Sequence, residues 1–267
     1  MKSYPYLSPR SAKAGIAVAL LCLSHVAQAQ IKAANDSGAT DFRLGLGVIP
    51  SDEGYKGIGL KTSLLPAVQI QTPRFSLRGT SAEFMVTNPE NQTFSVNLRA
   101  DLLLQGYKAA DGAIFTGMAR RDPSLLVGVG IKYTTPVGQF WAETGVDATG
   151  NSKGMRSEVG VGWRFNTDSA LGKWTFTPYV SAQLNNAKLT NYYFGVSKSE
   201  ATANRPAYQA GSATNLNAGI SAVTQLTPSV SMLLGARYRH YGESIRQSPL
   251  VDSNGAISGN LSLLYRF

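Results

Sequence analysis

Cysteine and histidine are almost missing from this chain, which has one cysteine, Cys22, and two histidines, His25 and His240. Cys22 and His25 lie in residues 1–29, which have the order of a secretion signal: a basic leader, an apolar run at 14–27 and Ala-Gln-Ala at 27–29. We expect cleavage after Ala29. The mature chain then has no thiol, which excludes a disulfide framework, a thiolate metal site and a cysteine nucleophile.

Long apolar runs and charges are also scarce. No run of eighteen or more apolar residues occurs, so no transmembrane helix is predicted, and the run at 14–27 is too short for the alternative of an anchor helix. Charged residues make up 15% of the chain; loss of residues 1–29 removes three cations and no acid, so the formal charge falls from +9 to about +6. For an exported protein this excess of positive charge favours anionic lipid headgroups or the cell-wall polymer as partners. Nucleic acid is not an expected partner.

What the chain has in abundance is a two-residue hydrophobic period. In residues 92–104, Phe94, Val96 and Leu98 alternate with Ser95, Asn97 and Arg99. The same alternation recurs at 125–133, 157–165, 173–184, 215–226, 231–240 and 258–267. Side chains two apart lie on one face of a strand, so this pattern predicts an all-β protein.

Either a soluble sandwich or a closed antiparallel transmembrane β-barrel alternates in this way, and three features favour the barrel. The segments of about 9–14 residues match tilted membrane-crossing strands. Aromatic residues gather near strand ends, as in a membrane girdle. Charges fall on the polar face and are predicted to line the lumen: Arg99, Asp101, Lys132, Glu158, Arg164, Arg237 and Arg239. Because lipid offers no hydrogen bonds, such strands must close.

The strand count is less direct. Residues 30–40 are predicted to be a flexible periplasmic stretch and residues 41–267 the barrel, in which the visible strands number eleven. Bacterial barrels have an even number, so we expect about twelve, with ten and fourteen open. Pro66 is expected to split the segment 57–71, and a bulge at Gly79 to shift the phase of 74–87. Short turns are expected on the periplasmic side, and long loops, such as 106–122, 186–211 and 242–255, outside.

Catalysis is not predicted. The one histidine of the mature chain, His240, stands on the apolar face near a strand end, and pairing it with Ser244 or Ser248 as a catalytic couple is the less favoured interpretation. The acids on loops are scattered, so no metal site and no cofactor are expected. A narrow channel is a stronger rival; we instead expect the lumen cations to pair with Asp101, Glu143, Asp147 and Glu158 and to brace the wall.

Four stretches carry a family resemblance. Residues 44–57 form a glycine-rich strand that runs into an acidic-Gly-aromatic loop, and residues 64–79 contain Leu-Pro and then Arg-Phe-x-Leu. Residues 248–251 are Ser-Pro-Leu-Val before the last strand. The long loop holds a motif with Tyr192, Tyr193, Gly195, Val196, Glu200, Pro206 and Tyr208. Together they resemble the MltA-interacting protein (MipA/OmpV) family of outer-membrane proteins.

The resemblance implies a place and a role. It implies a barrel in the cell outer membrane of a Gram-negative bacterium, in contact with outer-membrane lipid. It also implies a scaffold that links a murein lytic transglycosylase to a bifunctional peptidoglycan synthase during cell-wall growth. A narrow outer-membrane channel and a surface-exposed adhesin or antigen are the alternative functions. The resemblance supplies no catalytic residues.

The last strand ends on an aromatic residue. Leu261, Leu263, Tyr265 and Phe267 alternate with polar residues up to the final position. A terminal Phe with an aromatic two residues earlier resembles the signal by which the barrel-assembly machinery recognises its clients. Tyr265 and Phe267 are therefore predicted to be the assembly signal.

Overall fold

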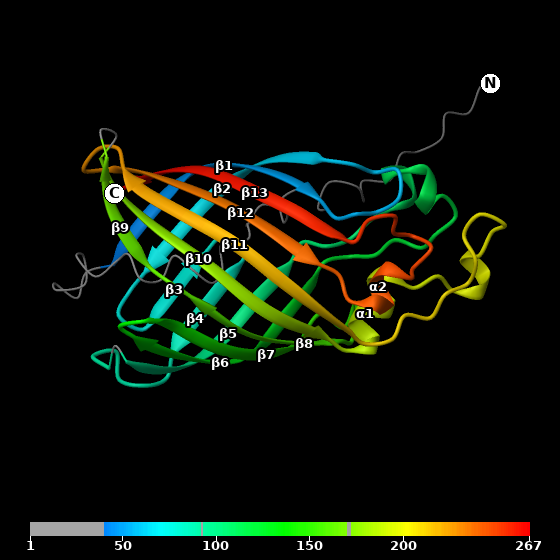
Figure 1. Ribbon diagram of the computed structural model, residues 1–267, viewed down its shortest axis with the longest axis horizontal. Coiled ribbons are helices and arrows are strands. Elements are labelled where there is room, and N and C mark those ends of the chain that lie inside the picture. The colour runs from blue at the N-terminus through cyan, green and yellow to red at the C-terminus, as the bar shows by residue number, and fades with distance from the viewer. Residues whose placement is uncertain (1–39, 92, 170–171) are drawn as a thin grey trace, which may run out of the picture.

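The protein is described here by a computed structural model that covers residues 40–91, 93–169 and 172–267. The predicted signal peptide, 1–29, and all of the stretch 30–40 except Thr40 lie outside the described residues. Antiparallel strands form most of the chain (Figure 1). The strands are β1 (Asp41–Asp52), β2 (Lys61–Gln71), β3 (Phe75–Arg78), β4 (Ser81–Met85), β5 (Phe94–Leu103), β6 (Ser124–Thr135), β7 (Gly138–Asp147), β8 (Met155–Gly162), β9 (Phe165–Ser169), β10 (Gly172–Asn185), β11 (Ala213–Gln225), β12 (Val230–His240) and β13 (Gly255–Arg266).

The strands close into a ring. Each strand pairs with the next one along the chain except β8, which pairs with β10 and not with β9; β13 pairs with β1, and β10 also pairs with β9 and β11. β8 and β9 lie one after the other along β10 and are separated by Trp163 and Arg164, so they are one strand with a break. The ring in the described residues therefore has twelve strand positions. The expected twelve-stranded transmembrane barrel is confirmed.

The count is reached differently from the way the sequence predicted. Pro66 does not split its segment, because β2 is continuous and pairs Pro66 with Leu46 of β1. Gly79 is not a bulge; with a φ of 56° it lies in a tight turn that joins two short strands, β3 and β4. The phase shift in 74–87 is thus a change of strand.

The two faces of the wall follow the two-residue period. Leu44, Leu46 and Val48 of β1 and Leu261, Leu263 and Tyr265 of β13 are exposed on the outside, where lipid covers them. The buried strand residues that alternate with such positions are mostly polar. Inside, glycines make room for aromatic rings: a Cβ on Gly160 would lie 2.2 Å from the Trp141 ring, and one on Gly219 2.6 Å from Tyr179.

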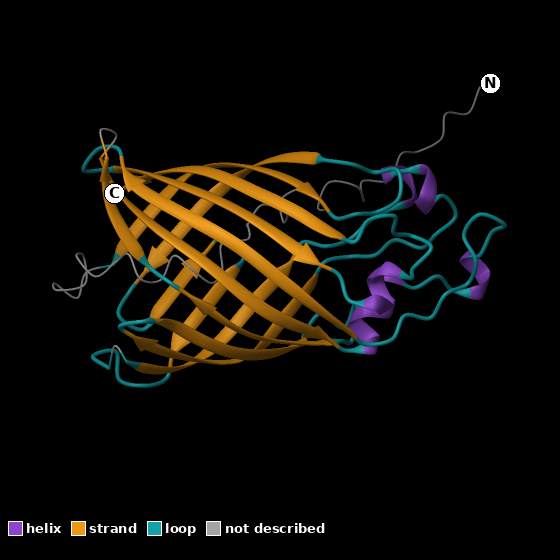
Figure 2. Ribbon diagram, viewed as in Figure 1, coloured by secondary structure: helices purple, strands orange, loops and turns teal. Residues whose placement is uncertain are grey.

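The two ends of the barrel differ (Figure 2). The C-terminus and the short turns lie at one end, and the long loops with the short helices gather at the other. The helices are the α-helices α1 (Ala187–Phe194) and α2 (Glu243–Arg246) and the 3-10 helices η3 (Ala109–Asp111), η4 (Ala113–Phe115) and η5 (Lys198–Glu200). None of the helices in the described residues is long and apolar enough to span a membrane. By the usual orientation of such barrels, the long-loop end is the outer one.

Candidate functional site

A network of charges lines the lumen side of the neighbouring strands β4 to β7. Arg99 of β5 forms ion pairs with Glu83 of β4, with Asp101 at 3.0 Å and with Glu143 of β7 at 3.0 Å. Lys132 of β6 binds the other oxygen of Glu83 at 2.5 Å. Each buried cation thus has a carboxylate to offset its loss of water. The network ties four neighbouring strands together, and its central acid, Glu83, was not among the predicted residues.

The predicted bracing partners are otherwise placed differently. Asp147 binds its own turn, since its carboxylate accepts hydrogen bonds from Thr149, Ser152 and Lys153. Glu158 is buried and accepts a hydrogen bond from Gln183 at 2.9 Å. No ion pair of Glu158 occurs in the described residues. Bracing by ion pairs therefore belongs to Arg99 and Lys132, and the expected pairing of Glu158 and Asp147 with lumen cations is wrong.

The other predicted lumen charges divide into two groups. Arg237 and Arg239 of β12, together with Arg156 of β8, line a cavity inside the outer half of the barrel. Arg164 does not lie in mid-strand as predicted; its side chain is exposed in the break between β8 and β9. The alternation continues through this break in the sequence, so the pattern alone hides it.

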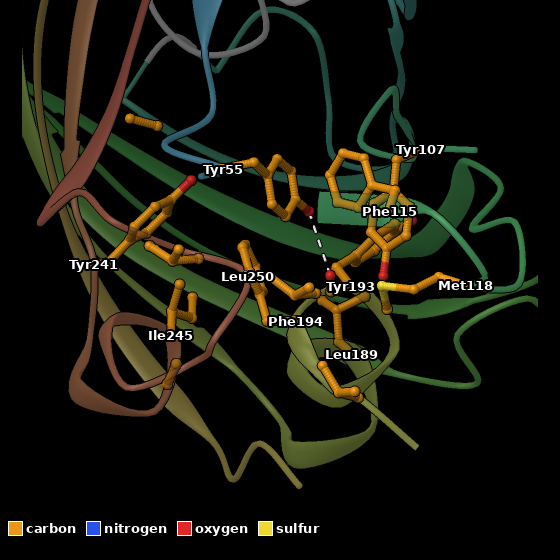
Figure 3. Close-up of a cluster of buried hydrophobic side chains, with 14 residues drawn as sticks. Tyr55, Tyr107, Phe115, Met118, Leu189, Tyr193, Phe194, Tyr241, Ile245 and Leu250 are labelled. Atoms are coloured by element: carbon orange, nitrogen blue, oxygen red, sulfur yellow. Dashed lines mark hydrogen bonds between the residues drawn. The ribbon is translucent and has the colours of Figure 1, made fainter. Parts of the chain in front are cut away.

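The outer end of the barrel is closed by an aromatic cluster, which we call the outer cap (Figure 3). Tyr55 comes from the β1–β2 loop, and Tyr107 and Phe115 come from the β5–β6 loop; the rings of Tyr107 and Phe115 stack at 4.0 Å. The further buried members are Met118, Leu189, Tyr193, Phe194, Val196, Ala213, Tyr241, Ile245, Leu250, Val251 and Ala256. Four long loops therefore bury a common apolar core above the lumen.

The predicted family motif supplies much of this cap. Tyr193 is 1% exposed, and its hydroxyl donates to Ser124 Oγ at 3.0 Å. The Tyr192 hydroxyl accepts a hydrogen bond from Asp122 N–H at 2.7 Å. Val196 and Tyr208 form a backbone bridge, and Tyr208 donates to Ser244 O at 2.8 Å. A Cβ on Gly195 would lie 2.4 Å from Asn191 O, so only glycine fits there.

Glu200 is the electrostatic centre of the loop contacts. Each of its two carboxylate oxygens accepts a hydrogen bond of 3.0 Å from Arg121 Nη2, and the carboxylate also accepts backbone hydrogen bonds from Ser197 and Ala119. Burial raises the pKa of Glu200, but these hydrogen bonds and the Arg121 charge outweigh burial and lower the pKa to about 2. Pro206, the remaining motif residue, is exposed beside buried Arg205, whose guanidinium donates to Thr116 O at 3.1 Å.

Tyr55, Tyr193 and Tyr241 of the cap act as neutral hydrogen-bond donors, whereas the buried Tyr107 hydroxyl has no hydrogen-bond partner among the described residues. Burial raises the pKa of Tyr107 and of Tyr193 to about 12 each, and it raises the pKa of Tyr241 above its ordinary value. Tyr241 donates to Glu53 O at 2.7 Å. The cap is therefore held by uncharged aromatic packing and by a few charged contacts, and its tyrosines remain protonated at any physiological pH.

The structure gives little support for a catalytic couple at His240. His240 pairs with Leu216 and Gly255 at the end of β12. Ser248 is 2% exposed, and its hydroxyl donates to Phe194 O at 2.6 Å, so it serves the cap. Among the described residues, no group of three or more His, Cys, Asp or Glu side chains is arranged to hold a metal ion.

The two residues of the predicted assembly signal lie together at the other end. The rings of Tyr265 and Phe267 meet edge to face at 5.0 Å, and both side chains are exposed. Phe267 N–H donates to Phe42 O at 3.2 Å, and the ring centroids of Phe42 and Phe267 lie 5.6 Å apart. The C-terminus thus completes the seam between β13 and β1.

These features define a class: a closed transmembrane β-barrel with a braced lumen and a capped outer mouth. The sequence profile of the family described as MltA-interacting protein MipA matches residues 44–267. The chain belongs to this family of outer-membrane proteins, and its place is the outer membrane of a Gram-negative bacterium.

Two relatives and one solved structure are similar to this chain. The MltA-interacting protein of Escherichia coli strain K12 is 22% identical, over 85% of this chain and 90% of that protein. The outer membrane protein OmpV of Vibrio cholerae is 28% identical, over 57% of each. An outer membrane channel from Pseudomonas putida F1 is 10% identical in its solved structure, covers 86% of this chain and 96% of its own, and has a TM-score of 0.41.

Proposed function

We propose that this barrel is a scaffold that holds a murein lytic transglycosylase, and with it a peptidoglycan synthase, at the outer membrane during cell-wall growth. The name of the relative from Escherichia coli, MltA-interacting protein, supports the first partner. A scaffold needs a surface on the periplasmic side, where both enzymes act. The barrel offers one such surface that is unusual for a closed sheet.

The observation that carries the proposal is the edge of β9. This strand pairs with β10 alone, and among the described residues Asn166–Asp168 have no strand partner on their other edge. All five residues of β9 are exposed. Figure 1 places β9 at the end of the barrel that holds the C-terminus. An exposed edge accepts a strand from another protein through backbone hydrogen bonds, a recurring mode of peptide recognition.

The interior fits a scaffold better than an open channel. The outer cap covers the mouth, and the network around Arg99 lines the wall below it. A solute that enters from the outer end must displace the cap. The loops that an adhesin would use are instead packed on one another.

Photo-crosslinking in living cells tests this function. A photoreactive amino acid at Thr167 or Asp168 is expected to capture a lytic transglycosylase. The same amino acid at Asn204, which is exposed in the long loop at the opposite end, is the matched control and is expected to capture none. Capture of the enzyme from Asn204 as efficiently as from β9, or capture from neither in cells that contain the enzyme, contradicts the proposal.

A further inference from the structure

The barrel wall has a window near its outer end. β2 pairs with β3 only over Gln69–Gln71, because β3 and β4 turn back at Gly79 and Thr80. On the outer side of this turn, residues 61–67 of β2 pair with β1. Among the described residues they have no strand partner on their other edge. β5 continues past the turn with Leu102 and Leu103. β2 and β5 lie three strand spacings apart, about 14 Å, and no strand in the described part of the chain fills this width.

The backbone of β2 is adapted to this edge. Gly79 N–H donates to Val68 O at 3.2 Å, so the polar groups of Val68 face the window side. Backbone groups two residues apart point the same way along a strand, so those of Pro66 and Leu64 face the window too. Pro66 has no N–H to leave unpaired there. Leu64 pairs with Val48, and both are exposed on the lipid side, so the window reaches the apolar band of the wall.

A cavity of about 370 Å³ lies directly behind the window. Ser63 and Leu65 of β2 and Leu102 and Leu104 from the β5 side line it at the window. Its roof is the underside of the outer cap, formed by Tyr55, Tyr107 and Phe115 (Figure 3). Its size is within the range of small-molecule sites, roughly 300–1,000 Å³. The roof is therefore mostly aromatic, and the entrance combines leucines with the polar side chains of Lys61, Ser63 and Thr80.

The opposite wall of the cavity is cationic. Arg156, Arg237 and Arg239 line it, and Arg156 is close enough to be repelled by the other two and attracted by Glu158 and Asp101. Arg156 Nε donates to Asn185 Oδ1 and Arg239 Nε to Asn217 Oδ1, each at 3.1 Å. The terminal nitrogens of Arg156 and Arg239 have no hydrogen-bond or ion-pair partner among the described residues. Glu158 is the one acid of the cavity on these same two strands, β8 and β12.

We propose that the cavity binds a single-tailed amphipathic carboxylate, which enters sideways from the membrane through the window. The carboxylate binds the terminal nitrogens of Arg156 and Arg239, with the geometry that guanidinium groups favour. The tail lies against the leucines of the window and the aromatic roof. Such a ligand offsets the charge of the cationic wall and covers the leucines of the entrance at the same time. The inference is independent of the scaffold role, which concerns the other end of the barrel.

Calorimetric titration of the purified full-length mature chain in neutral detergent tests the site. Laurate is expected to bind at least tenfold tighter than dodecanol, which has the same tail and no charge. The pair Arg156→Gln/Arg239→Gln is expected to lose this difference, and Arg156→Lys/Arg239→Lys to keep most of it. The pair Arg120→Gln/Arg246→Gln, at exposed positions of the outer loops, is the matched control and is expected to bind as the wild type does.

Equal binding of laurate and dodecanol by the wild type, or no binding of either, overturns the site, and this comparison needs no variant to fold. A folded glutamine pair that retains the laurate preference overturns the role of the two arginines. Heat-dependent gel migration reports folding of each variant.

The route is tested separately by stopped-flow association. A bulky maleimide on Ser63→Cys is expected to slow laurate association at least fivefold, whereas the same label on Ser229→Cys, in a turn at the opposite end, leaves the rate unchanged. An unchanged rate with label at position 63 overturns entry through the window.

Discussion

At the scale of single residues, Glu83 is the acid that offsets the charge of two buried cations. It is 6% exposed and lies between two buried cations, with one oxygen on Arg99 and the other on Lys132. Removal of its charge leaves Lys132 without an ion-pair partner among the described residues and reduces the acids around Arg99 to Asp101 and Glu143. An uncompensated buried charge is among the costliest defects in a folded protein.

Glu83→Gln is therefore expected to lower the free energy of unfolding by roughly 3–5 kcal/mol. Urea unfolding in detergent micelles, followed by tryptophan fluorescence, measures this change. Glu90→Gln, at an exposed position of the β4–β5 turn, is the control and is expected to change little. Equal stability of the two variants contradicts the role given to Glu83.

The pH dependence of the outer cap is expected to follow Glu200. The pKa of this group is lowered from 4.5 to about 2 in the folded chain, so its stabilising effect is complete above about pH 4.5 and is lost as the pH falls towards 2. Amide hydrogen exchange of residues 119–121 and 197–205 is expected to accelerate through this window. Glu200→Gln is expected to show fast exchange at neutral pH and a weaker acid response. An acid response of wild-type size in this variant counts against Glu200.

At the scale of elements, the loops are as much a part of the packed structure as the strands. Tyr55 pairs with Val251 through a backbone bridge, and Arg121 reaches the carbonyl of Tyr192 at 2.8 Å. Each contact joins loops that are distant in the chain. The cap is thus a second apolar core, separate from the lipid-covered wall, and we expect it to loosen without loss of the barrel.

Phe115→Ala is expected to show this separation. Phe115 is 1% exposed and stacks on Tyr107, so its truncation should cost the cap about 3–5 kcal/mol. Hydrogen exchange should accelerate in the four outer loops and stay slow in the strands. Phe84→Ala, which removes the same ring from the lipid side, is the control and is expected to leave the loops unchanged. Uniform acceleration in loops and strands indicates a single cooperative unit instead.

At the scale of the whole molecule, closure depends on the seam between the first and last strands. β1 and β13 pair from Arg43 with Arg266 to Asp52 with Ile257. Phe267 extends the seam by its hydrogen bond to Phe42 O and by ring contacts with Phe42 and Tyr265. The terminal residue therefore has a structural role at the seam in addition to the recognition role that was predicted for it.

Deletion of Phe267 is expected to reduce the amount of the barrel in the outer membrane several-fold while export to the periplasm continues. Quantitative immunoblotting of membrane and periplasmic fractions measures both. Phe267→Tyr keeps an aromatic end and is expected to assemble close to normally. Normal outer-membrane levels of the truncated chain contradict this prediction.

Much of the barrel was predictable from local pattern. Which residues of β1, β5 and β13 face lipid follows from a period that the backbone of any strand imposes, whatever its neighbours are. The break at Trp163 and Arg164 keeps the same period, so Arg164 was misplaced. The turn at Gly79 changes the period, but a bulge changes it in the same way, so the sequence could not separate the two.

The sequence by itself determined the barrel, its lipid face, its closing strand and its family, because each is written in neighbouring residues. The tertiary structure alone decided the pairing of Glu83 with Lys132, the contact of Arg121 with Glu200 and the cavity behind β2. These depend on the order of strands around the ring, which brings together residues 49 and 79 positions apart in the chain. A window likewise exists only because β3 and β4 are shorter than the strands on either side. Local alternation carries no information about which distant side chains meet across a lumen.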